Sequence, residues 1–351
     1  MRSPATIMPN ITSKFIGAAF VLGLIALCFD VSARAQSADG SEAPKKYFMF
    51  MDLKEGEGQS QRGSPDYNKY KVVPIKDGIY MIEAMVGNMA FSVGEDGAFL
   101  IDSGFSSMTD TMIKTIAEYT DKPIEMLFNT HWHGDHVGSN ITLGGRGVLI
   151  LSQDDVMQWL TTPQISGMSA APKKPFPPAG LPKITFSDEM TIRFNGQTIK
   201  ARKVPAAHTA GDAYIHFVEA NVFVLGDIYT TGTYPWIDLN TGGDINGLVQ
   251  ALDDVIDEAN PDSVIVPGHM RLSNYAELVD YRDMVATMRD RIQAAINDGK
   301  SLEEILASKP LADLDEKWGN PLVSTEVITL VVHDSLLGKG TKTAYETVGG
   351  E

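Results

Sequence analysis

The amino-acid sequence predicts an α/β domain made of two half-sandwiches packed face to face. Short apolar segments of strand length alternate with amphipathic segments of helical length, and the order strands-then-helices occurs twice along the chain. Several predicted strands are followed directly by histidine or aspartate. This is the carboxyl end of a strand, where α/β folds place their functional sites.

The first 35 residues have the layout of a secretory signal peptide. Arg2 and Lys14 form a positive start, residues 15–29 are almost continuously apolar, and Ala33-Arg34-Ala35 matches a cleavage site. The apolar run is short for a membrane span. We therefore expect a periplasmic or secreted protein without a stable membrane anchor, whose mature chain begins near Gln36.

The only cysteine, Cys28, lies inside this apolar run, and Leu27 precedes it where a lipoprotein signal requires a small residue. We expect no lipid attachment. The mature chain then has no thiolate, so its metal ligands must be His, Asp or Glu. The net charge of -16 argues against a nucleic-acid partner, which would require a basic face.

Residues 36–70, rich in Ser, Gly, Lys, Glu and Pro, are predicted to form a flexible arm, and residues 71–351 one domain that ends in helices. A hairpin of 79–84 and 89–93 turns at Gly87-Asn88, and a second of 190–194 and 198–204 turns at Asn195-Gly196. Further strands are predicted at 98–101, 124–128, 148–151, 213–218, 222–225 and 263–266. Helices are predicted at 108–119, 153–162, 245–258, 278–297, 302–308 and 325–336.

The segment Asn129–Asn140 reads NTHWHGDHVGSN and carries His131, His133, Asp135 and His136. Burying these groups together is costly unless a divalent metal binds them, because imidazole nitrogen and carboxylate oxygen are its natural ligands. In an extended loop the first two histidines point to one side, while Asp135 and His136 turn toward another. One segment can therefore serve two metal ions.

Three more candidate ligands stand at or close after the ends of predicted strands, each with a glycine nearby: His208, Asp227 and His269. Small neighbours allow the backbone to approach a metal closely. Any of these residues alone is more often structural, but their joint appearance after the histidine segment supports one common site. His216 lies within a predicted strand and His333 within a predicted helix, and we expect both to be structural.

Asp102 follows an apolar strand and precedes a tight turn. It is a candidate to hold a metal-binding imidazole or the histidine segment in place, and a role in capping the turn is an equal alternative.

With these residues, the sequence resembles the metallo-β-lactamase fold superfamily, from about residue 71 to about residue 278. The resemblance implies a four-layered αββα sandwich with a dinuclear zinc site at one edge of the sheets. It assigns His131, His133 and His208 to the first zinc ion, Asp135, His136 and His269 to the second, and Asp227 to a position where relatives have a bridging aspartate or a cysteine. The spacing leaves open another divalent metal, such as iron or manganese.

The resemblance implies an exported hydrolase that attacks a carbonyl group of a small molecule with a metal-bound hydroxide, because two metal ions lower the pKa of a shared water. Asp135 would orient this nucleophile and assist the leaving group. We expect hydrolysis of β-lactams with modest rates and broad scope, by a monomer. The aspartate at 227 and Thr230, where specialised β-lactamases carry cysteine and lysine, depart from those enzymes.

Two alternatives stay open: a lactonase or thioesterase with the same metal site, and a protein that binds metal without turnover. Residues 163–183, rich in Pro, Gly, Ser and Met, are long enough for a lid or pocket wall. Trp132, Tyr229, Tyr234 and Trp236 are candidates to line that pocket or, equally, to pack a loop. Lys173 and Lys174 would meet an anionic substrate or remain solvated.

Overall fold

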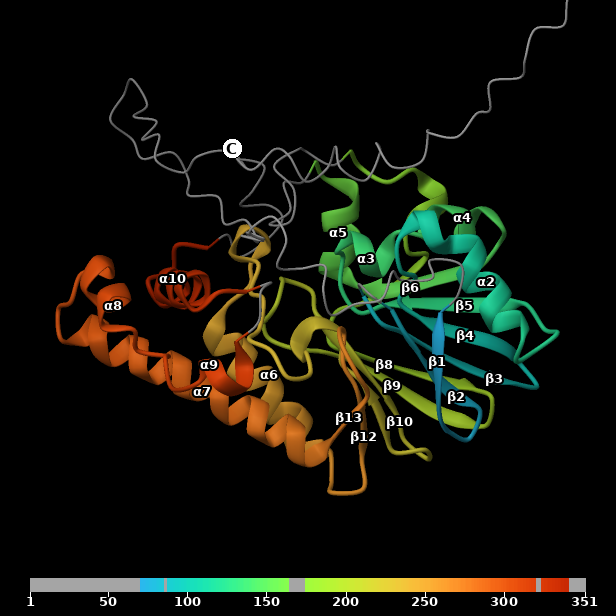
Figure 1. The fold of residues 1–351 in the computed structure, drawn as a ribbon. Helices are drawn as coiled ribbons and strands as arrows, with labels where there is room; N and C mark the ends of the chain where they lie inside the picture. Colours follow the sequence, from blue (N-terminus) through green and yellow to red (C-terminus); the bar gives the residue numbers. More distant parts are fainter. Residues whose placement is uncertain (1–69, 85–86, 164–173, 320–322, 341–351) are drawn as a thin grey trace, which may run out of the picture. The chain divides into compact units, whose positions relative to one another are not determined.

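Two mixed β-sheets lie face to face, with helices on the outer side of each (Figure 1). The computed structural model describes residues 70–84, 87–163, 174–319 and 323–340. The predicted signal peptide, and all of the predicted arm except residue 70, lie outside these ranges. Within them, no helix combines the length and the apolar character needed to cross a membrane.

The first sheet follows chain order, from an antiparallel half to a parallel half. Its antiparallel strands are β1 (Lys71–Lys76), β2 (Ile79–Glu83), β3 (Met89–Gly94) and β4 (Gly97–Ile101). The strands β5 (Ile124–Asn129), β6 (Leu149–Gln153) and β7 (Ile184–Phe186) continue it in parallel from β4. Parallel strands bring their carboxyl ends to one edge, so the residues that follow β4 and β5 are neighbours.

The second sheet has the order β13-β12-β11-β10-β9-β8. Its pairs are antiparallel except for β11 with β12. Its strands are β8 (Glu189–Phe194), β9 (Gln197–Lys203), β10 (Ala213–Phe217), β11 (Val222–Val224), β12 (Val264–Val266) and β13 (Ser273–Asn274). The one parallel pair places the residues that follow β11 and β12 side by side.

Three apolar layers hold this arrangement together. The middle layer lies between the sheets and includes Phe99 and Phe128 from the first sheet and Ile215 and Phe217 from the second. A second layer packs the first sheet on α2 (Thr109–Ala117) and α4 (Asn140–Gly145), and a third packs the second sheet on α6 (Ile245–Glu258), α7 (Tyr275–Asn297) and α10 (Thr325–Leu336). The predicted four-layered αββα sandwich is therefore confirmed.

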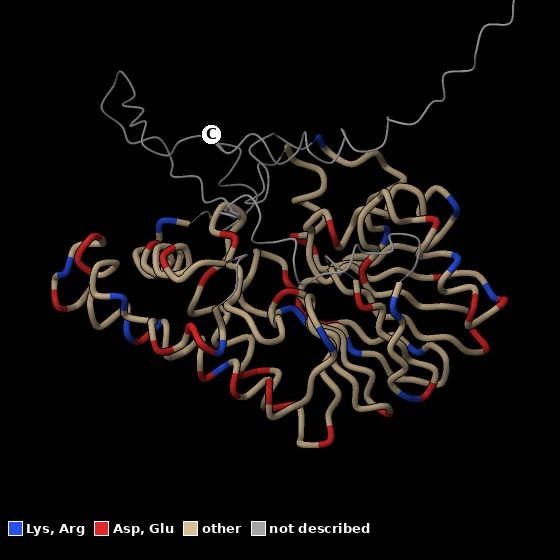
Figure 2. The backbone as a smooth tube through the Cα atoms, viewed as in Figure 1, with Lys and Arg blue, Asp and Glu red and all other residues tan. Residues whose placement is uncertain are grey.

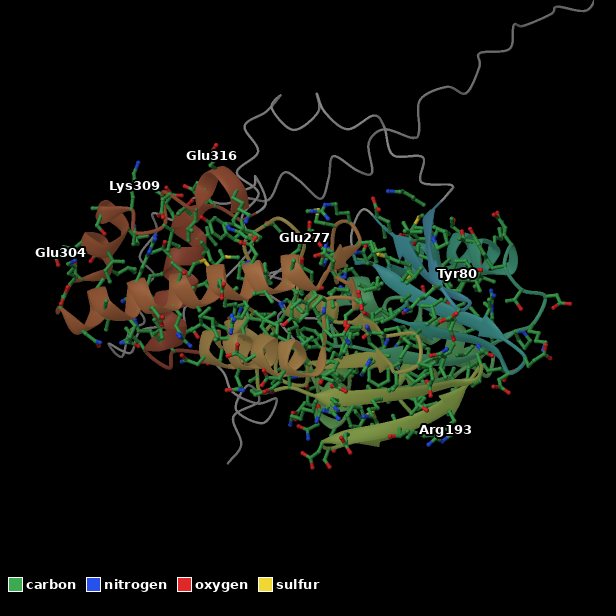
Figure 3. All side chains as sticks on the ribbon, turned by 90° about the horizontal axis from the view of Figure 1, so that it is seen from below. Tyr80, Arg193, Glu277, Glu304, Lys309 and Glu316 are labelled. Carbon is green, nitrogen blue, oxygen red and sulfur yellow. The ribbon has the colours of Figure 1, made fainter. Side chains whose placement is uncertain are left out.

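The remaining short helices are α3 (Gly134–Val137), α5 (Asp154–Thr161), α8 (Leu302–Ser308) and α9 (Asp315–Trp318). Figure 3 shows Glu304 on α8 and Lys309 directly after it, away from Tyr80 and Arg193 of the two sheets. Acidic and basic positions are interspersed along the described backbone (Figure 2).

Local signals explain why most predicted elements agree with the structure. The Asp244 side chain accepts hydrogen bonds from two backbone amides at the start of α6, and Ser301 forms a capping box with Glu304 at the start of α8. Asn274 likewise caps α7, which therefore begins at Tyr275, three residues before the predicted start. The sequence did not predict β1, β7 and β13, because β1 has no fully buried residue and the other two are very short edge strands.

The inter-sheet layer generates a prediction about stability. Phe99 is fully buried, and its ring centroid lies 6.0 Å from that of Phe194 and 6.4 Å from that of Phe217. Phe99→Ala should lower the free energy of unfolding by about 3–5 kcal/mol, since it removes buried area and leaves a cavity. Denaturant unfolding of the two proteins would measure this, with Ile184→Ala at a half-exposed edge position as the control that changes it by less than about 1 kcal/mol.

Candidate metal centre

The predicted ligands meet at one edge of the two sheets. The histidine segment follows β5, Asp227 follows β11, His269 follows β12, and His208 lies between β9 and β10. An isolated parallel bridge joins Thr230 to His269. Both sheets therefore contribute to a single cluster of imidazoles and carboxylates.

The histidine segment changes its backbone conformation at His133. This residue is extended, with φ -61° and ψ 150°, and is the N-cap of α3, which begins at Gly134. The expectation of one extended loop is thus wrong beyond His133. The start of a helix, and not alternation along a strand, turns Asp135 and His136 away from His131 and His133.

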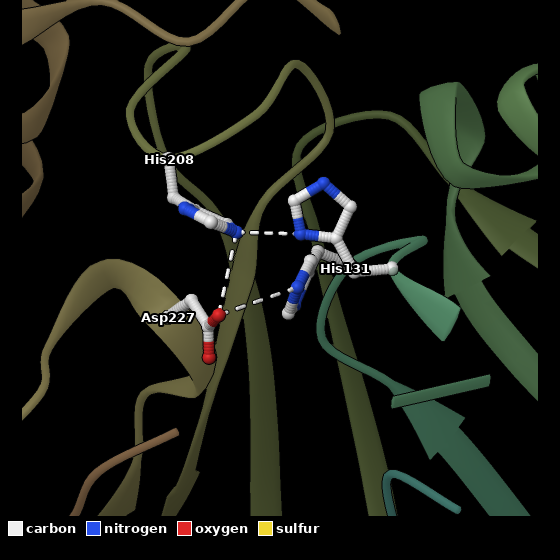
Figure 4. A group of neighbouring side chains, drawn as sticks. His131, His208 and Asp227 are labelled. Carbon is white, nitrogen blue, oxygen red and sulfur yellow. Dashed lines mark hydrogen bonds and ion pairs between the residues drawn. The ribbon is translucent and has the colours of Figure 1, made fainter. Parts of the chain in front are cut away.

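The first group consists of His131, His133, His208 and Asp227, and all four are buried. His208 Nε2 lies 2.8 Å from His133 Nδ1 and 3.4 Å from Asp227 Oδ2. His131 Nε2 lies 3.8 Å from the same carboxylate oxygen. Figure 4 shows His131, His208 and Asp227 pointing toward one another.

The second group consists of Asp135, His136 and His269. Asp135 Oδ2 lies 3.7 Å from His136 Nε2 and 3.5 Å from His269 Nε2. Asp227 lies between the groups, since its Oδ1 is 3.2 Å from His136 Nε2 and its Oδ2 is 3.2 Å from His269 Nε2. In each group the potential ligand atoms lie within 4.8 Å of one another, so each could hold a metal ion.

Each imidazole has one ring nitrogen in the cluster and the other bonded to an orienting group outside it. The partners are Thr130 Oγ1 for His131 (3.1 Å), Asp238 Oδ2 for His133 (3.0 Å), the Trp236 carbonyl for His208 (2.7 Å), Asp102 Oδ2 for His136 (2.8 Å) and the Gly87 amide for His269 (3.2 Å). Metal-binding histidines typically donate their outer ring N–H to such an oxygen, as four of these contacts allow. At His269 the direction is reversed, because the Gly87 amide donates to Nδ1.

The buried Nε2 atoms of His131 and His136 and the Oδ1 atom of Asp227 have no hydrogen-bond partner among the described residues. Unsatisfied buried polar atoms are rare, and bound cations, one in each group, would satisfy all three. The donor set of nitrogen and carboxylate oxygen, without sulfur, therefore fits a divalent metal.

In each group, one histidine is oriented by a buried carboxylate: His136 by Asp102 and His133 by Asp238. Asp102 accepts hydrogen bonds from the Thr130 amide and hydroxyl and binds His136, so it holds the histidine segment as well as an imidazole. The structure thus shows the first of the two expected roles of Asp102, which is to hold a metal-binding imidazole and the histidine segment in place. Sequence reasoning missed Asp238, which binds His133 and whose amide donates to the His208 carbonyl, because it stands 105 residues from His133 without a metal-binding motif.

Glycine is required where the strand ends converge. The Gly268 amide donates to the carbonyls of Gly226 and Tyr229, at 2.8 and 3.0 Å, and a Cβ atom on Gly268 would collide with the Asp227 carboxylate. The Asn88 side chain fixes the same loop by donating to the carbonyls of Pro267 and Met270. These contacts set the position of His269.

The aromatic candidates mostly pack the interior. Trp132 is buried and stacks on Trp159 with 5.8 Å between ring centroids. The Tyr229 hydroxyl bonds Ser273 at 2.7 Å, and that of Tyr234 bonds Asp315 at 2.9 Å, so both belong to the helical core and not to a pocket wall. Trp236 reaches the site through its carbonyl group.

The other candidates lie outside the cluster. His216 bonds Glu258 and stacks on Phe223, and His333 bonds Asp334, in agreement with their expected structural roles. Lys174 is exposed. Residues 164–173 of the predicted pocket wall, which include Lys173, lie outside the described ranges. The described end of that segment packs its Pro178–Gly180 turn on α4.

The two groups differ in protonation. Burial and the neighbouring His136 hold the pKa of His131 well below its usual value, and burial lowers the pKa of His208. Burial also opposes a proton on His136 and His269, but nearby carboxylates, Asp227 above all, outweigh it and raise both pKa values. Although burial favours the neutral acid, the same imidazoles hold the pKa of Asp227 well below its usual range.

Comparison with known proteins identifies relatives of this arrangement. The model of the metallo-beta-lactamase superfamily matches residues 83–269, which contain every predicted ligand. No curated protein sequence matches the chain significantly.

Three solved structures illustrate the shared fold. A metallo-beta-lactamase from Pontibacter korlensis is 18% identical with a TM-score of 0.52, and the alignment covers 62% of this chain and 99% of that one. The DIM-1 metallo-beta-lactamase is 14% identical with a TM-score of 0.51, at 62% and 98% coverage. The inverting sec-alkylsulfatase Pisa1 from Pseudomonas sp. is 16% identical with a TM-score of 0.60, covering 77% of this chain and 50% of that one. At these identities the likeness shows the fold alone.

The contact between Asp238 and His133 predicts a specific loss of metal affinity. Asp238→Asn keeps the shape of the side chain but removes the carboxylate that orients His133. The affinity of the first group for zinc should fall by about 10- to 100-fold. Competition against a chromophoric chelator measures it, with Asp188→Asn on the surface as the control. Unchanged zinc affinity in Asp238→Asn would contradict the orienting role.

The raised pKa values of His136 and His269 predict that metal binding depends on pH. A protonated imidazole must lose its proton before it can bind a metal, so zinc affinity of the second group should fall as the pH decreases through these raised pKa values, above 6.5. The pKa values of His131 and His208 are lowered, so these two imidazoles of the first group should stay neutral to more acidic pH. Calorimetric titration in two buffers of different ionisation enthalpy counts the released protons, and equal pH dependence of both groups would refute this assignment.

Proposed function

Because the chain belongs to the metallo-β-lactamase superfamily, whose members are metal-dependent hydrolases, we propose that it is an exported dinuclear zinc hydrolase that opens cyclic amides, with β-lactams as the favoured substrates. The first 35 residues are the proposed export signal, and residues 71–351 are the proposed catalytic domain. The proposed enzyme is a monomer. Membership of the superfamily and the candidate metal site do not depend on export or on the oligomeric state.

The observation that carries the dinuclear proposal is the position of Asp227. One of its oxygens faces His136, and the other faces His131, His208 and His269. A carboxylate can bridge two cations in this arrangement, because each oxygen offers a lone pair to a different ion. A structural site for one ion is closed by four protein ligands, whereas this cluster provides seven potential ligand groups.

In this proposal His131, His133 and His208 hold the first ion, Asp135, His136 and His269 hold the second, and Asp227 contacts both. Two bound zinc ions would supply Lewis acidity at the substrate carbonyl and a water of lowered pKa. The buried imidazoles and the carboxylates of Asp102 and Asp238 fix the ligands before substrate arrives, so little reorganisation accompanies the reaction.

Asp135 is the proposed catalytic residue. Its carboxylate is buried, and Oδ2 faces both histidines of the second group. A carboxylate there accepts a hydrogen bond from the attacking water, which orients the water's lone pair toward the carbonyl carbon. After attack it can hold the proton that the leaving amide nitrogen requires.

Thr230 favours the alternative of a lactonase or thioesterase. It stands where specialised β-lactamases carry a lysine, and its hydroxyl lies 3.5 Å from that of Tyr281 in the interior. This position therefore offers no positive charge to a substrate carboxylate. A neutral ester or thioester has no such requirement.

The first test is hydrolysis of a chromogenic cephalosporin by the purified mature chain. We expect turnover that is lost with a chelator, returns with added zinc and falls by at least about 10³-fold in His131→Ala, because the first group loses a ligand. Lactones, thioesters and sec-alkyl sulfates are assayed in parallel.

The outcomes separate the candidates. Faster turnover of lactones or thioesters would show that they, and not β-lactams, are the substrate class. Turnover of alkyl sulfates alone would refute carbonyl attack. A protein that carries two zinc ions but hydrolyses none of these substrates would favour metal binding without turnover.

A further inference from the structure

The two ends of the histidine segment are joined by a pair of side-chain amides. Asn140 Nδ2 donates to Asn129 Oδ1 at 2.7 Å, and Asn129 Nδ2 donates to Asn140 Oδ1 at 3.3 Å. Both residues are completely buried. Asn129 is the last residue of β5 and Asn140 the first of α4, so this amide pair closes the segment that carries four of the predicted ligands.

The amide pair reaches a metal-binding residue through the backbone of His136. The His136 carbonyl accepts hydrogen bonds from Asn129 Nδ2 at 3.3 Å, from the Ser103 amide at 2.8 Å and from the Ser103 hydroxyl at 3.2 Å. The Ser103 hydroxyl is also 2.9 Å from Asn140 Oδ1 and accepts from the Ser139 amide at 3.2 Å. Every member of this network is almost fully buried.

His136 is consequently held at two points. Asp102 fixes its ring, and the amide pair together with Ser103 fixes its carbonyl. Asp102 and Ser103 are adjacent in the chain, so both contacts originate from the end of β4. A buried polar network that is fully satisfied restricts the backbone to one arrangement.

We propose that Asn129 and Asn140 are positioning residues that hold Asp135 and His136 in a metal-binding arrangement before any metal arrives. The inference rests on the dinuclear part of the proposed function and is independent of the substrate. The pair acts through the backbone at His136, so its loss should weaken the second group more than the first. His208 and Asp227 of the first group lie outside the segment, in the β9–β10 loop and shortly after β11, and do not depend on the amide pair.

The test uses Asn140→Leu and the double variant Asn129→Leu/Asn140→Leu. Leucine has nearly the shape of asparagine but cannot donate or accept. The single variant leaves Asn129 Oδ1 buried without its donor and is destabilised for that reason alone. The double variant leaves no side-chain amide unsatisfied and should keep its fold. Asn260→Leu is the matched control, because Asn260 and Asn221 form an exposed amide contact at the amino end of β11, the end opposite to Asp227.

The first measurement is zinc affinity by chelator competition, together with the absorption spectrum of the cobalt-substituted protein. We expect the second ion to bind about tenfold or more weakly in the double variant, with the first ion changed by less than about threefold. The two asparagines act as a unit, so the double variant should bind zinc no more weakly than Asn140→Leu. Equal loss at both ions, or wild-type affinity for the second ion, would overturn the proposal.

The second measurement is amide hydrogen exchange of the metal-free protein. Residues 129–140 should exchange faster in the double variant than in the wild type and in Asn260→Leu, while the inter-sheet strands remain unchanged. Unchanged exchange in this segment would also overturn the proposal. If the wild type binds only one zinc ion, the dinuclear function fails, and the exchange comparison still decides whether the amide pair orders the segment.

Discussion

The Asp227 carboxylate is buried among four imidazoles, and the arrangement of the whole site depends on this interaction. A carboxylate in such a place would be strongly destabilised without positive neighbours. His136 and His269, with their raised pKa values, supply that charge in the metal-free protein. The same electrostatic demand makes the cluster suitable for divalent cations, which replace the protons and compensate the carboxylates more completely.

The fold brings the imidazoles and carboxylates together because several strands end at the same edge of the two sheets. Parallel pairing of β4 with β5 and of β11 with β12 brings Asp102, the histidine segment, Asp227 and His269 to one edge. The approach is close enough that Gly268 has no room for a side chain beside the Asp227 carboxylate. The sandwich core thus determines the distances between groups that are far apart in the sequence.

A second layer of contacts orients each ligand. Asp102, Asp238 and the Trp236 carbonyl each bind the ring nitrogen that points away from the cluster, and the Asn129–Asn140 amide pair holds the backbone of the second group. The two groups are therefore supported differently. Electrostatics distinguishes them as well, because the lowered pKa values belong to the first group and the raised values to the second.

The sequence by itself determined the fold class, most strands and helices, and all seven candidate ligands. These depend on local patterns: hydrophobic periodicity, capping residues, turn dipeptides and a dense histidine motif. The helices 245–258, 302–308 and 325–336 have the predicted bounds because their ends are marked by capping residues or turns. Only the tertiary structure decided the orienting role of Asp238, the interior positions of Tyr229 and Tyr234, and the turn from extended backbone into α3 at His133. Each of these depends on which distant segment lies opposite a residue, and that is set by the pairing of strands and the packing of the sheets, which no single stretch of sequence contains.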